Sequence, residues 1–239
     1  MSEYKKPEDL VLDNGTSLRF LNKDYKNFLN ETTIVCGASR SGKSIIVDEI
    51  TNLCKDYVSE TFVFSETDIT LSTYYGKLPD ECIITSNHLD RLNSILQLRE
   101  NAKLCKITRD AMANIILIFD DCPSFGKWSK NSDVFKELFY NYRFYNITII
   151  ISSQSSKDIS CELRRRFTAL IFTTYNASDE YFKRPSNAFS EDEKTQAELY
   201  SKNVLINHFR HLNHKKLVYF DNSLNYLTNP FFYTIANLA

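Results

Sequence analysis

The fold is decided by the stretch Cys36-Gly37-Ala38-Ser39-Arg40-Ser41-Gly42-Lys43-Ser44, which satisfies the pattern G-x-x-x-x-G-K-[ST] in full. Residues 32–36 before it have the composition of a short buried strand. Residues 45–54 after it place apolar side chains at helical spacing. A strand, a glycine loop and a helix in this order form the context that the motif requires. The alternative is a chance match in the strand–turn–helix of an ordinary α/β protein.

The glycine loop predicts a site for phosphate groups. Its glycines let several backbone N–H groups converge on a phosphate, helped by the positive end of the following helix. Lys43 is expected to reach the β- and γ-phosphates of a nucleotide, and the Ser44 hydroxyl to take one coordination position of Mg²⁺. The predicted nucleotide-binding residues are Gly37, Ala38, Ser39, Arg40, Ser41, Gly42, Lys43, Ser44 and Ile45.

Length and composition indicate one large α/β domain. The chain has 239 residues, of which 43% are hydrophobic, enough for a sizeable core. We divide it into an N-terminal extension, residues 1–30, and a P-loop domain, residues 31–239. The net charge of −1 excludes a generally basic protein that coats DNA, although a local basic strip stays possible.

The cysteines and histidines do not indicate a disulfide framework or a structural metal. The 6 cysteines are scattered and contain no C-x-x-C pair, which favours buried thiols in a reducing compartment. His208, His211 and His214 are spaced by three, which does not hold all three on one helical face. The polar N-terminus and the absence of a membrane-length apolar run predict a soluble intracellular protein without stable membrane insertion.

A second motif lies in residues 114–121, Asn-Ile-Ile-Leu-Ile-Phe-Asp-Asp. A continuous apolar run of this length is typical of a central parallel strand that is buried on both faces. Acids at its carboxyl end lie where open α/β sheets bind ligands. Asp120 is expected to hold Mg²⁺ as the Walker B acid, and Asp121 to polarise the attacking water. The alternative is that the paired acids cap the turn formed by residues 122–124.

Residues 146–154 repeat this layout of a buried strand that ends in polar side chains. Gln154 would emerge at the same edge of the sheet as the acids, where it suits a sensor that hydrogen-bonds the γ-phosphate or the water. A turn-capping amide is the alternative. The next helix, residues 157–166, ends in Leu163-Arg164-Arg165-Arg166. These arginines fit a solvated face, a contact with DNA phosphates, or an arginine finger for a neighbouring subunit.

The remaining elements follow from hydrophobic periodicity and turn signals. We expect a hairpin from residues 10–12 and 17–20 near the N-terminus. Residues 190–193 offer a helix N-cap followed by acids. Further expected elements are strands at 60–65, 82–85 and 168–173, helices at 88–102 and 132–142, a polar helical region at 175–214, and a closing hairpin from 216–220 and 224–227.

Taken in order, the segments GASRSGKS, ILIFDD, IISSQ and LRRRF resemble the FtsK/HerA superfamily of P-loop ATPases. Within that group the sequence looks most like the poxvirus-type genome-packaging ATPases of large DNA viruses and virophages. The resemblance covers roughly residues 30–175 and extends to the closing hairpin. It implies a RecA-like α/β fold of the strand-inserted type, with a mostly parallel central sheet and helices on both faces. The chain length leaves no room for the extra domains of the cellular members, which favours the viral form.

The resemblance also implies a function and a location. Such proteins form rings of five or six subunits that hydrolyse ATP with Mg²⁺ and drive double-stranded DNA into a capsid. The implied partners are double-stranded DNA, other copies of the chain and the viral capsid vertex, and the implied locations are the virion and the host-cell cytoplasm (virus factory).

The resemblance assigns roles to individual residues. Lys43 and Ser44 match the P-loop lysine and serine, Asp120 the Mg²⁺ acid, Asp121 the catalytic acid and Gln154 the sensor. Among the three arginines we favour Arg164 as the finger. Asp121 departs from the glutamate that is common in the cellular members. Its side chain is shorter, which changes the distance from its carboxylate to the attacking water.

Two other classes of protein stay open. A nucleoside or small-molecule kinase would place the Walker B strand next to the P-loop strand and carry an arginine-rich lid. A scaffold with a degenerate NTPase fold would lack catalytic side chains, whereas every expected catalytic position here is filled.

Overall fold

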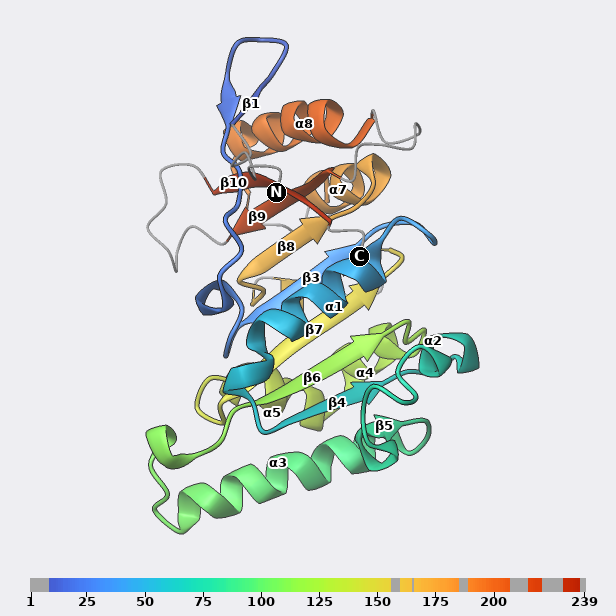
Figure 1. The fold of residues 1–239 in the computed structure, drawn as a ribbon, viewed down its shortest axis with the longest axis vertical. Coiled ribbons are helices and arrows are strands. Elements are labelled where there is room, and N and C mark those ends of the chain that lie inside the picture. Colours follow the sequence, from blue (N-terminus) through green and yellow to red (C-terminus); the bar gives the residue numbers. More distant parts are fainter. Residues whose placement is uncertain are drawn as a thin grey trace, which may run out of the picture.

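The P-loop strand lies inside an eight-stranded sheet that has helices on both faces (Figure 1). The computed structural model describes residues 9–155, 160–164, 166–184, 189–206, 215–220 and 230–236. Arg165, the three closely spaced histidines and the strand expected at 224–227 lie outside the described residues.

The strands of the sheet follow the order β10-β9-β8-β3-β7-β6-β4-β5. Strands β8, β3, β7, β6, β4 and β5 are parallel, whereas β9 and β10 run antiparallel at one edge. This confirms the mostly parallel sheet expected from the sequence. The bounds are β3 Thr32–Cys36, β4 Glu60–Phe64, β5 Ile83–Ile84, β6 Ile115–Asp120, β7 Ile147–Ser153, β8 Ala169–Phe172, β9 Lys215–Phe220 and β10 Phe231–Ile235.

Strand β7 lies between the P-loop strand β3 and the strand β6 that ends in Asp120. All side chains of β6 and β7 are buried, as expected for strands covered on both faces. Alternate residues of β6 point to opposite faces, because Ile115, Leu117 and Phe119 belong to one buried cluster and Ile116 and Ile118 to the other. The apolar runs therefore supply both layers of the core at once.

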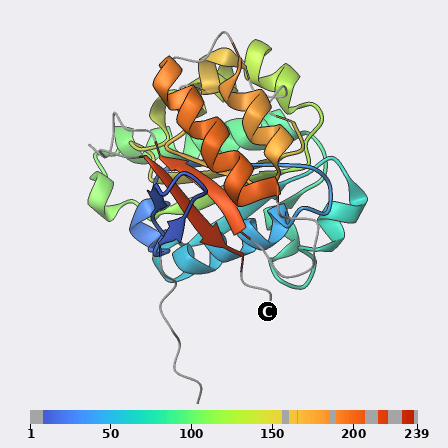
Figure 2. The same ribbon diagram turned by 90° about the horizontal axis from the view of Figure 1, so that it is seen from above.

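Helices cover the two faces unequally. Helix α1, Lys43–Cys54, packs on one face, whereas α3, α5, α7 and α8 pack on the other. Figure 2 shows α1 on the opposite side of the sheet from α7 and α8. The helices are α2 Asp68–Ser72, α3 His88–Leu104, α4 Phe125–Asn131, α5 Asp133–Asn141, α6 Cys161–Arg164, α7 Tyr175–Phe182 and α8 Glu191–Leu205, and the short 3₁₀ turns are Tyr25–Asn27, Lys55–Tyr57, Asp80–Cys82 and Arg109–Ala111.

Most of the expected helices and strands are present within one or two residues of their expected bounds. Helix α8 begins with the expected N-cap, a reciprocal capping box between Ser190 and Glu193. The short helices α2 and α4 were not expected, because both lie outside the ranges for which helices were predicted. Among the described residues, no helix combines the length and the apolar character needed to cross a bilayer.

The two ends of the described chain pack together at the edge of the sheet. The expected N-terminal hairpin consists of β1, Leu10–Val11, and β2, Ser17–Leu18. Leu18 is buried, and the backbone N–H of Leu21 donates to the carbonyl of Tyr233 in β10 at 2.8 Å. The strand that pairs with β9 is β10. The division into an extension and a P-loop domain stays a prediction.

The buried layers predict the effect of shortening a core side chain. Leu117 in β6 is fully buried, so Leu117→Ala is expected to lower the free energy of unfolding by about 2–5 kcal/mol. Leu98 in α3 is 69% exposed, so Leu98→Ala should change it by no more than about 0.5 kcal/mol. Urea unfolding followed by circular dichroism measures both. Equal losses in the two variants would contradict the strand assignment.

Candidate functional site

The carboxyl ends of β3, β7 and β6 meet at one edge of the sheet. In the parallel register Cys36 faces Ser153, and Asp120 faces Ser152. Beyond the strands, the N–H of Gly37 donates to the carbonyl of Ser153 at 3.2 Å, and the side-chain amide of Gln154 donates to Asp121 Oδ1 at 3.1 Å. The sequence-predicted acids, amide and glycine loop are therefore neighbours.

The glycine loop fits tightly against the end of β8. A Cβ atom on Gly37 would lie 1.8 Å from Thr173 Oγ1 and 2.9 Å from Ser41 Oγ, so a side chain is excluded at this position. The hydroxyls of Ser41 and Thr173 are hydrogen-bonded at 2.5 Å. Gly42 has a φ of 87°, a conformation that glycine adopts easily, and it begins α1. The motif glycines are thus required by the loop's shape.

Lys43 lies folded over this loop. Its Nζ donates to the carbonyls of Gly37 and Ala38, each at 2.9 Å. Burial lowers the pKa of Lys43, while the nearby carboxylates of Asp120 and Asp121 raise it. Lys43 therefore hydrogen-bonds to the loop and is affected by the charge of the acids that end β6.

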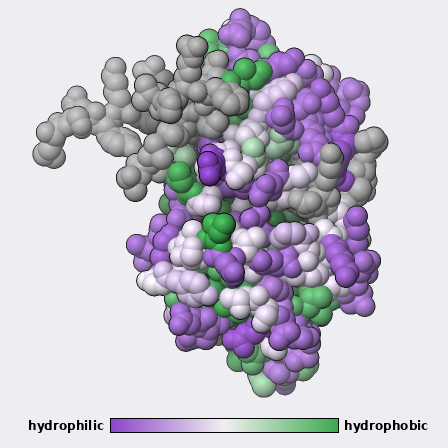
Figure 3. Space-filling model, turned by 90° about the vertical axis from the view of Figure 1, so that its right-hand side faces the viewer, coloured by the Kyte–Doolittle hydropathy of each residue, from purple (hydrophilic) through white to green (hydrophobic). Residues whose placement is uncertain are grey.

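The first turn of α1 opens toward the loop. The N–H of Ile46 donates to the carbonyl of Gly42, the residue before the helix, and the N–H groups that precede Ile46 have no acceptor inside the helix. Ala38, Ser39, Arg40 and Ser44 are exposed around this turn, and Ile45 is half-buried. Such a helix start attracts anions because of its free donors and its dipole. Figure 3 views this edge of the molecule, whose described surface is mainly hydrophilic with smaller apolar patches.

Asp120 is buried and accepts a hydrogen bond from the hydroxyl of Tyr74 at 2.8 Å. Burial raises the pKa of Asp120, whereas the Tyr74 hydrogen bond and the charge of Lys43 lower it. Tyr74 was not predicted as a site residue. It lies 46 residues before Asp120 and reaches it because β4 pairs with β6. No motif marks it, so only the strand order could have indicated this contact.

Asp121 is partly exposed and adopts a left-handed conformation with a φ of 51°. Aspartate tolerates this region better than most residues. The turn that Asp121 was alternatively expected to cap has another cap, because Glu66 accepts the N–H of Ser124 at 2.7 Å. The turn after β7 is likewise held by Ser153, whose hydroxyl accepts the N–H of Ser155 at 3.3 Å. These contacts disfavour the two alternatives, in which the paired acids or Gln154 only cap a turn.

A pocket of about 290 Å³ lies beside these two side chains. Asp121 and Gln154 line it together with Ser152 and Ser153. Its apolar wall contains Phe119 and Phe125, which belong to the cluster on the face away from α1. The Asp121 carboxylate can therefore be reached from that side of the sheet.

The two described arginines of the cluster after β7, Arg164 and Arg166, differ in their exposure. Arg164 in α6 is 5% exposed, and its carbonyl accepts a hydrogen bond from Tyr181 at 3.1 Å. A finger must reach out of its own subunit, and the burial of Arg164 disagrees with that role in this conformation. The partly exposed Arg166 stacks on the ring of Tyr140 at 3.8 Å. Of these two, Arg166 is better placed to contact another molecule.

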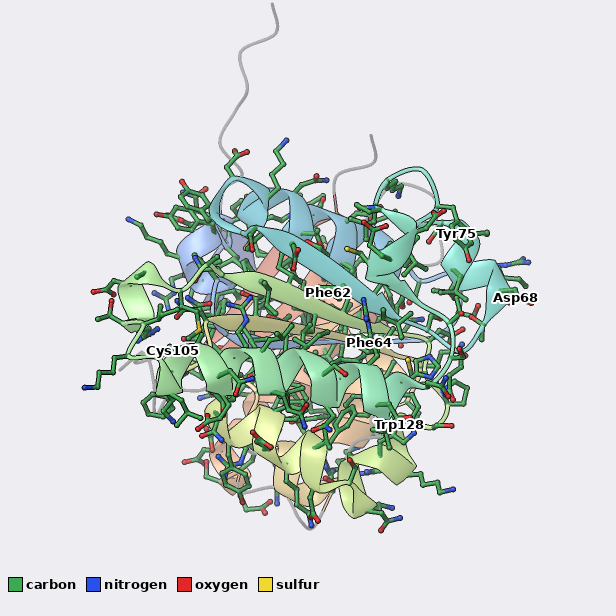
Figure 4. The ribbon with its side chains drawn as sticks, turned by 90° about the horizontal axis from the view of Figure 1, so that it is seen from below. Phe62, Phe64, Asp68, Tyr75, Cys105 and Trp128 are labelled. Atoms are coloured by element: carbon green, nitrogen blue, oxygen red, sulfur yellow. The ribbon has the colours of Figure 1, made fainter. Side chains whose placement is uncertain are left out.

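The contact between Tyr74 and Asp120 predicts a loss of stability in Tyr74→Phe. Removing the hydroxyl takes a donor from a buried carboxylate, which is expected to cost about 1.5–3 kcal/mol of unfolding free energy. Tyr75→Phe is the matched control, because Tyr75 is 51% exposed and lies at the outer end of this segment (Figure 4). Urea unfolding at neutral pH measures both variants. A Tyr74→Phe protein as stable as the control would contradict the contact.

The sequence relatives of this chain are viral proteins. It is 29% identical over 149 residues to the uncharacterized protein B354L of African swine fever virus (isolate Warthog/Namibia/Wart80/1980), which covers 62% of this chain and 40% of that protein. It is 25% identical over 153 residues to the uncharacterized protein 015R of Frog virus 3 (isolate Goorha), covering 62% and 46%. The chain thus spans less than half the length of these curated relatives. No protein-family model matches it.

Solved structures share the fold over most of the chain. The genome-packaging NTPase B204 of Sulfolobus turreted icosahedral virus 2, in complex with AMPPCP, superposes with a TM-score of 0.52 at 14% identity, covering 87% of this chain and 99% of that one. The EssC protein (ATPases 2 and 3) of Geobacillus thermodenitrificans superposes with a TM-score of 0.56 at 10% identity, covering 98% and 47%. Together with the strand order, these likenesses show that this chain shares the α/β fold of B204 and EssC, with a mostly parallel sheet and helices on both faces.

Proposed function

We propose that this chain is an ATP-hydrolysing motor that moves double-stranded DNA into a viral capsid. The observation that carries the proposal is the meeting of Lys43, Asp120 and Asp121 with Gln154 at the ends of three neighbouring strands. Each side chain has the chemistry that its proposed role needs: an ammonium for phosphate, a buried carboxylate for a metal, and a carboxylate and an amide for water.

The residues present fit a nucleotide with Mg²⁺. Gly37 leaves the loop without a side chain, and the exposed Ser44 stands at the start of α1. Ser44 and Asp120 would hold the metal ion, with Tyr74 fixing one oxygen of Asp120. When bound, Mg²⁺ neutralises charge on the phosphate oxygens. Lys43 would exchange its two carbonyl acceptors for phosphate oxygens.

The pair Asp121–Gln154 supports hydrolysis by water. The Gln154 amide donates to Oδ1 of Asp121, which holds the carboxylate in one orientation and leaves Oδ2 for a water molecule. A carboxylate in this position accepts a proton from water as it attacks. Aspartate is one methylene shorter than glutamate, so the left-handed backbone at Asp121 sets how far its carboxylate extends from β6.

The DNA-translocation part of the proposal is supported by likeness and by charge. B204, whose fold this chain shares, is a genome-packaging NTPase, and the sequence relatives are viral. A net charge of −1 suits a motor that must release DNA, because many phosphate contacts make binding tight and strongly salt-dependent. We infer a ring of five or six copies in the virion and the host-cell cytoplasm, in contact with the capsid vertex. An arginine from a neighbouring copy would complete each site.

The rival kinase function is disfavoured by the strand order. In that class the Walker B strand lies next to the P-loop strand, whereas β7 separates β3 from β6 here. Transfer of a phosphoryl group from ATP to a nucleoside would nevertheless support it.

Two substitutions separate nucleotide binding from hydrolysis. Asp121→Asn keeps the contact geometry but removes the base, so it should bind ATP normally and hydrolyse it about 10²–10⁴-fold more slowly. Lys43→Ala removes the phosphate-binding ammonium and should weaken ATP binding itself. Calorimetric titration and phosphate release measure the two effects. Asp133→Asn is the control, because its carboxylate is 97% exposed and pairs with Lys136 of the same helix. Undiminished hydrolysis by Asp121→Asn would contradict the assignment.

The motor proposal also predicts assembly. With a non-hydrolysable ATP analogue and double-stranded DNA, sedimentation should detect complexes of five or six copies, because the site needs an arginine from a neighbour. ATP hydrolysis should rise when DNA is added. A chain that stays monomeric under all conditions and hydrolyses ATP regardless of DNA would contradict the motor, though not the ATPase.

A further inference from the structure

A lysine far from the motif in sequence lies against the glycine loop. Lys216 is on β9, and its Nζ donates to the carbonyl of Ser41 at 2.7 Å. It is 1% exposed, and it is the one buried lysine in the part of the chain that the structure describes. Burying an ammonium is costly, and an apolar side chain would fill the same space without this cost. The position of Lys216 therefore calls for a reason beyond packing.

The contact fixes the direction of one peptide group. In a planar trans peptide, the C=O and the following N–H point in opposite directions. With the Ser41 oxygen held by Lys216, the N–H of Gly42 points away from the buried side, toward the open side of the loop. Gly42 also needs its lack of a side chain here, because a Cβ would lie 3.3 Å from Lys216 Nζ. The position of the Lys216 ammonium therefore depends on the missing side chain at Gly42.

The charge of Lys216 is retained under ordinary conditions. Burial lowers the pKa of Lys216 to about 8, and the carboxylate of Glu49 raises it. Glu49 is itself paired with Lys23 at 2.5 Å, and Lys23 also donates to the carbonyl of Ile235. At neutral pH most copies of the chain therefore carry a positive charge directly beneath the loop.

We propose that Lys216 is a second lysine of the phosphate site, which holds the Ser41–Gly42 peptide so that the Gly42 N–H faces the phosphate chain and adds positive charge beneath it. This inference rests on the proposed nucleotide-binding function. Lys216 is a positioning residue, because it touches the loop and not the reacting atoms. Lys43 and Lys216 would then hold different parts of the loop, since Lys43 donates to the Gly37 and Ala38 carbonyls and Lys216 to that of Ser41.

The test measures binding of inorganic pyrophosphate and of ATP to the full chain by calorimetric titration. Lys216→Met removes both the hydrogen bond and the charge, and it should weaken both ligands about tenfold or more, the equivalent of one charge-assisted hydrogen bond. Lys216→Gln keeps a donor without the charge and should lie between Lys216→Met and wild type. Lys215→Met is the matched control, because Lys215 is the half-buried neighbour on the same strand, and it should stay within about twofold of wild type.

The unfolding midpoint without ligand is measured for each variant. A merely structural lysine would lower that midpoint and leave the affinity of the folded protein unchanged, which would overturn the inference. If Lys216→Met does not fold, the comparison of Lys216→Gln with Lys215→Gln decides in the same way. Equal affinities of the variants and wild type would overturn this inference alone. A wild-type chain that binds neither ligand would overturn the proposed function and this inference with it.

Discussion

The arrangement of the whole site depends on the parallel pairing of β7 with both β3 and β6. This pairing brings Cys36, Asp120 and the end of β7 to the same level, so that the segments that follow them share one edge. It holds because all side chains of β7 are buried on the two faces, and a shift of one residue would exchange those faces. The register is therefore set by the core, and the relative positions of Lys43, Asp121 and Gln154 follow from it. A site built on three strand ends is also more rigid than one built on loops alone.

Much of this arrangement could be predicted from the sequence because its signals are local. The glycine motif, the continuous apolar runs of β6 and β7 and the polar residues that end them each occupy fewer than ten consecutive positions. Their meeting at one edge follows from the rule that parallel strands end together. The short helix α4 was missed because its seven residues follow a turn signal at residues 122–124, and a helix this short has little periodicity. The strand β10 was not predicted, because the turn signal after residues 216–220 placed the second strand of the hairpin at residues 224–227.

The residues that sequence reasoning missed act across long separations. Tyr74, in the turn after α2, lies 46 residues from Asp120, and Lys216, on β9, lies 175 residues from Ser41. Neither residue has a motif, and the alternation of β9 predicts only that Lys216 lies on one face of a sheet. Arg164 shows that a local basic cluster does not determine exposure, because tertiary packing buries the first arginine of the cluster. Local patterns thus predicted the backbone of the site, and only the strand order could supply its supporting contacts.

The polar contacts at the site divide into two kinds. Lys43 is partly exposed, and its acceptors are backbone carbonyls of the loop, so a phosphate with its full charge can replace them. The Ser41–Thr173 and Ser41–Lys216 contacts are buried, so they are not exposed to an anion from solvent. The first kind can therefore change when a ligand binds, while the second keeps the loop in shape. Tyr74 lies between the interior and the surface, because its buried hydroxyl donates to Asp120 while its neighbour Tyr75 faces solvent. The Tyr74 hydrogen bond therefore connects the segment at residues 66–80 to the carboxyl end of β6.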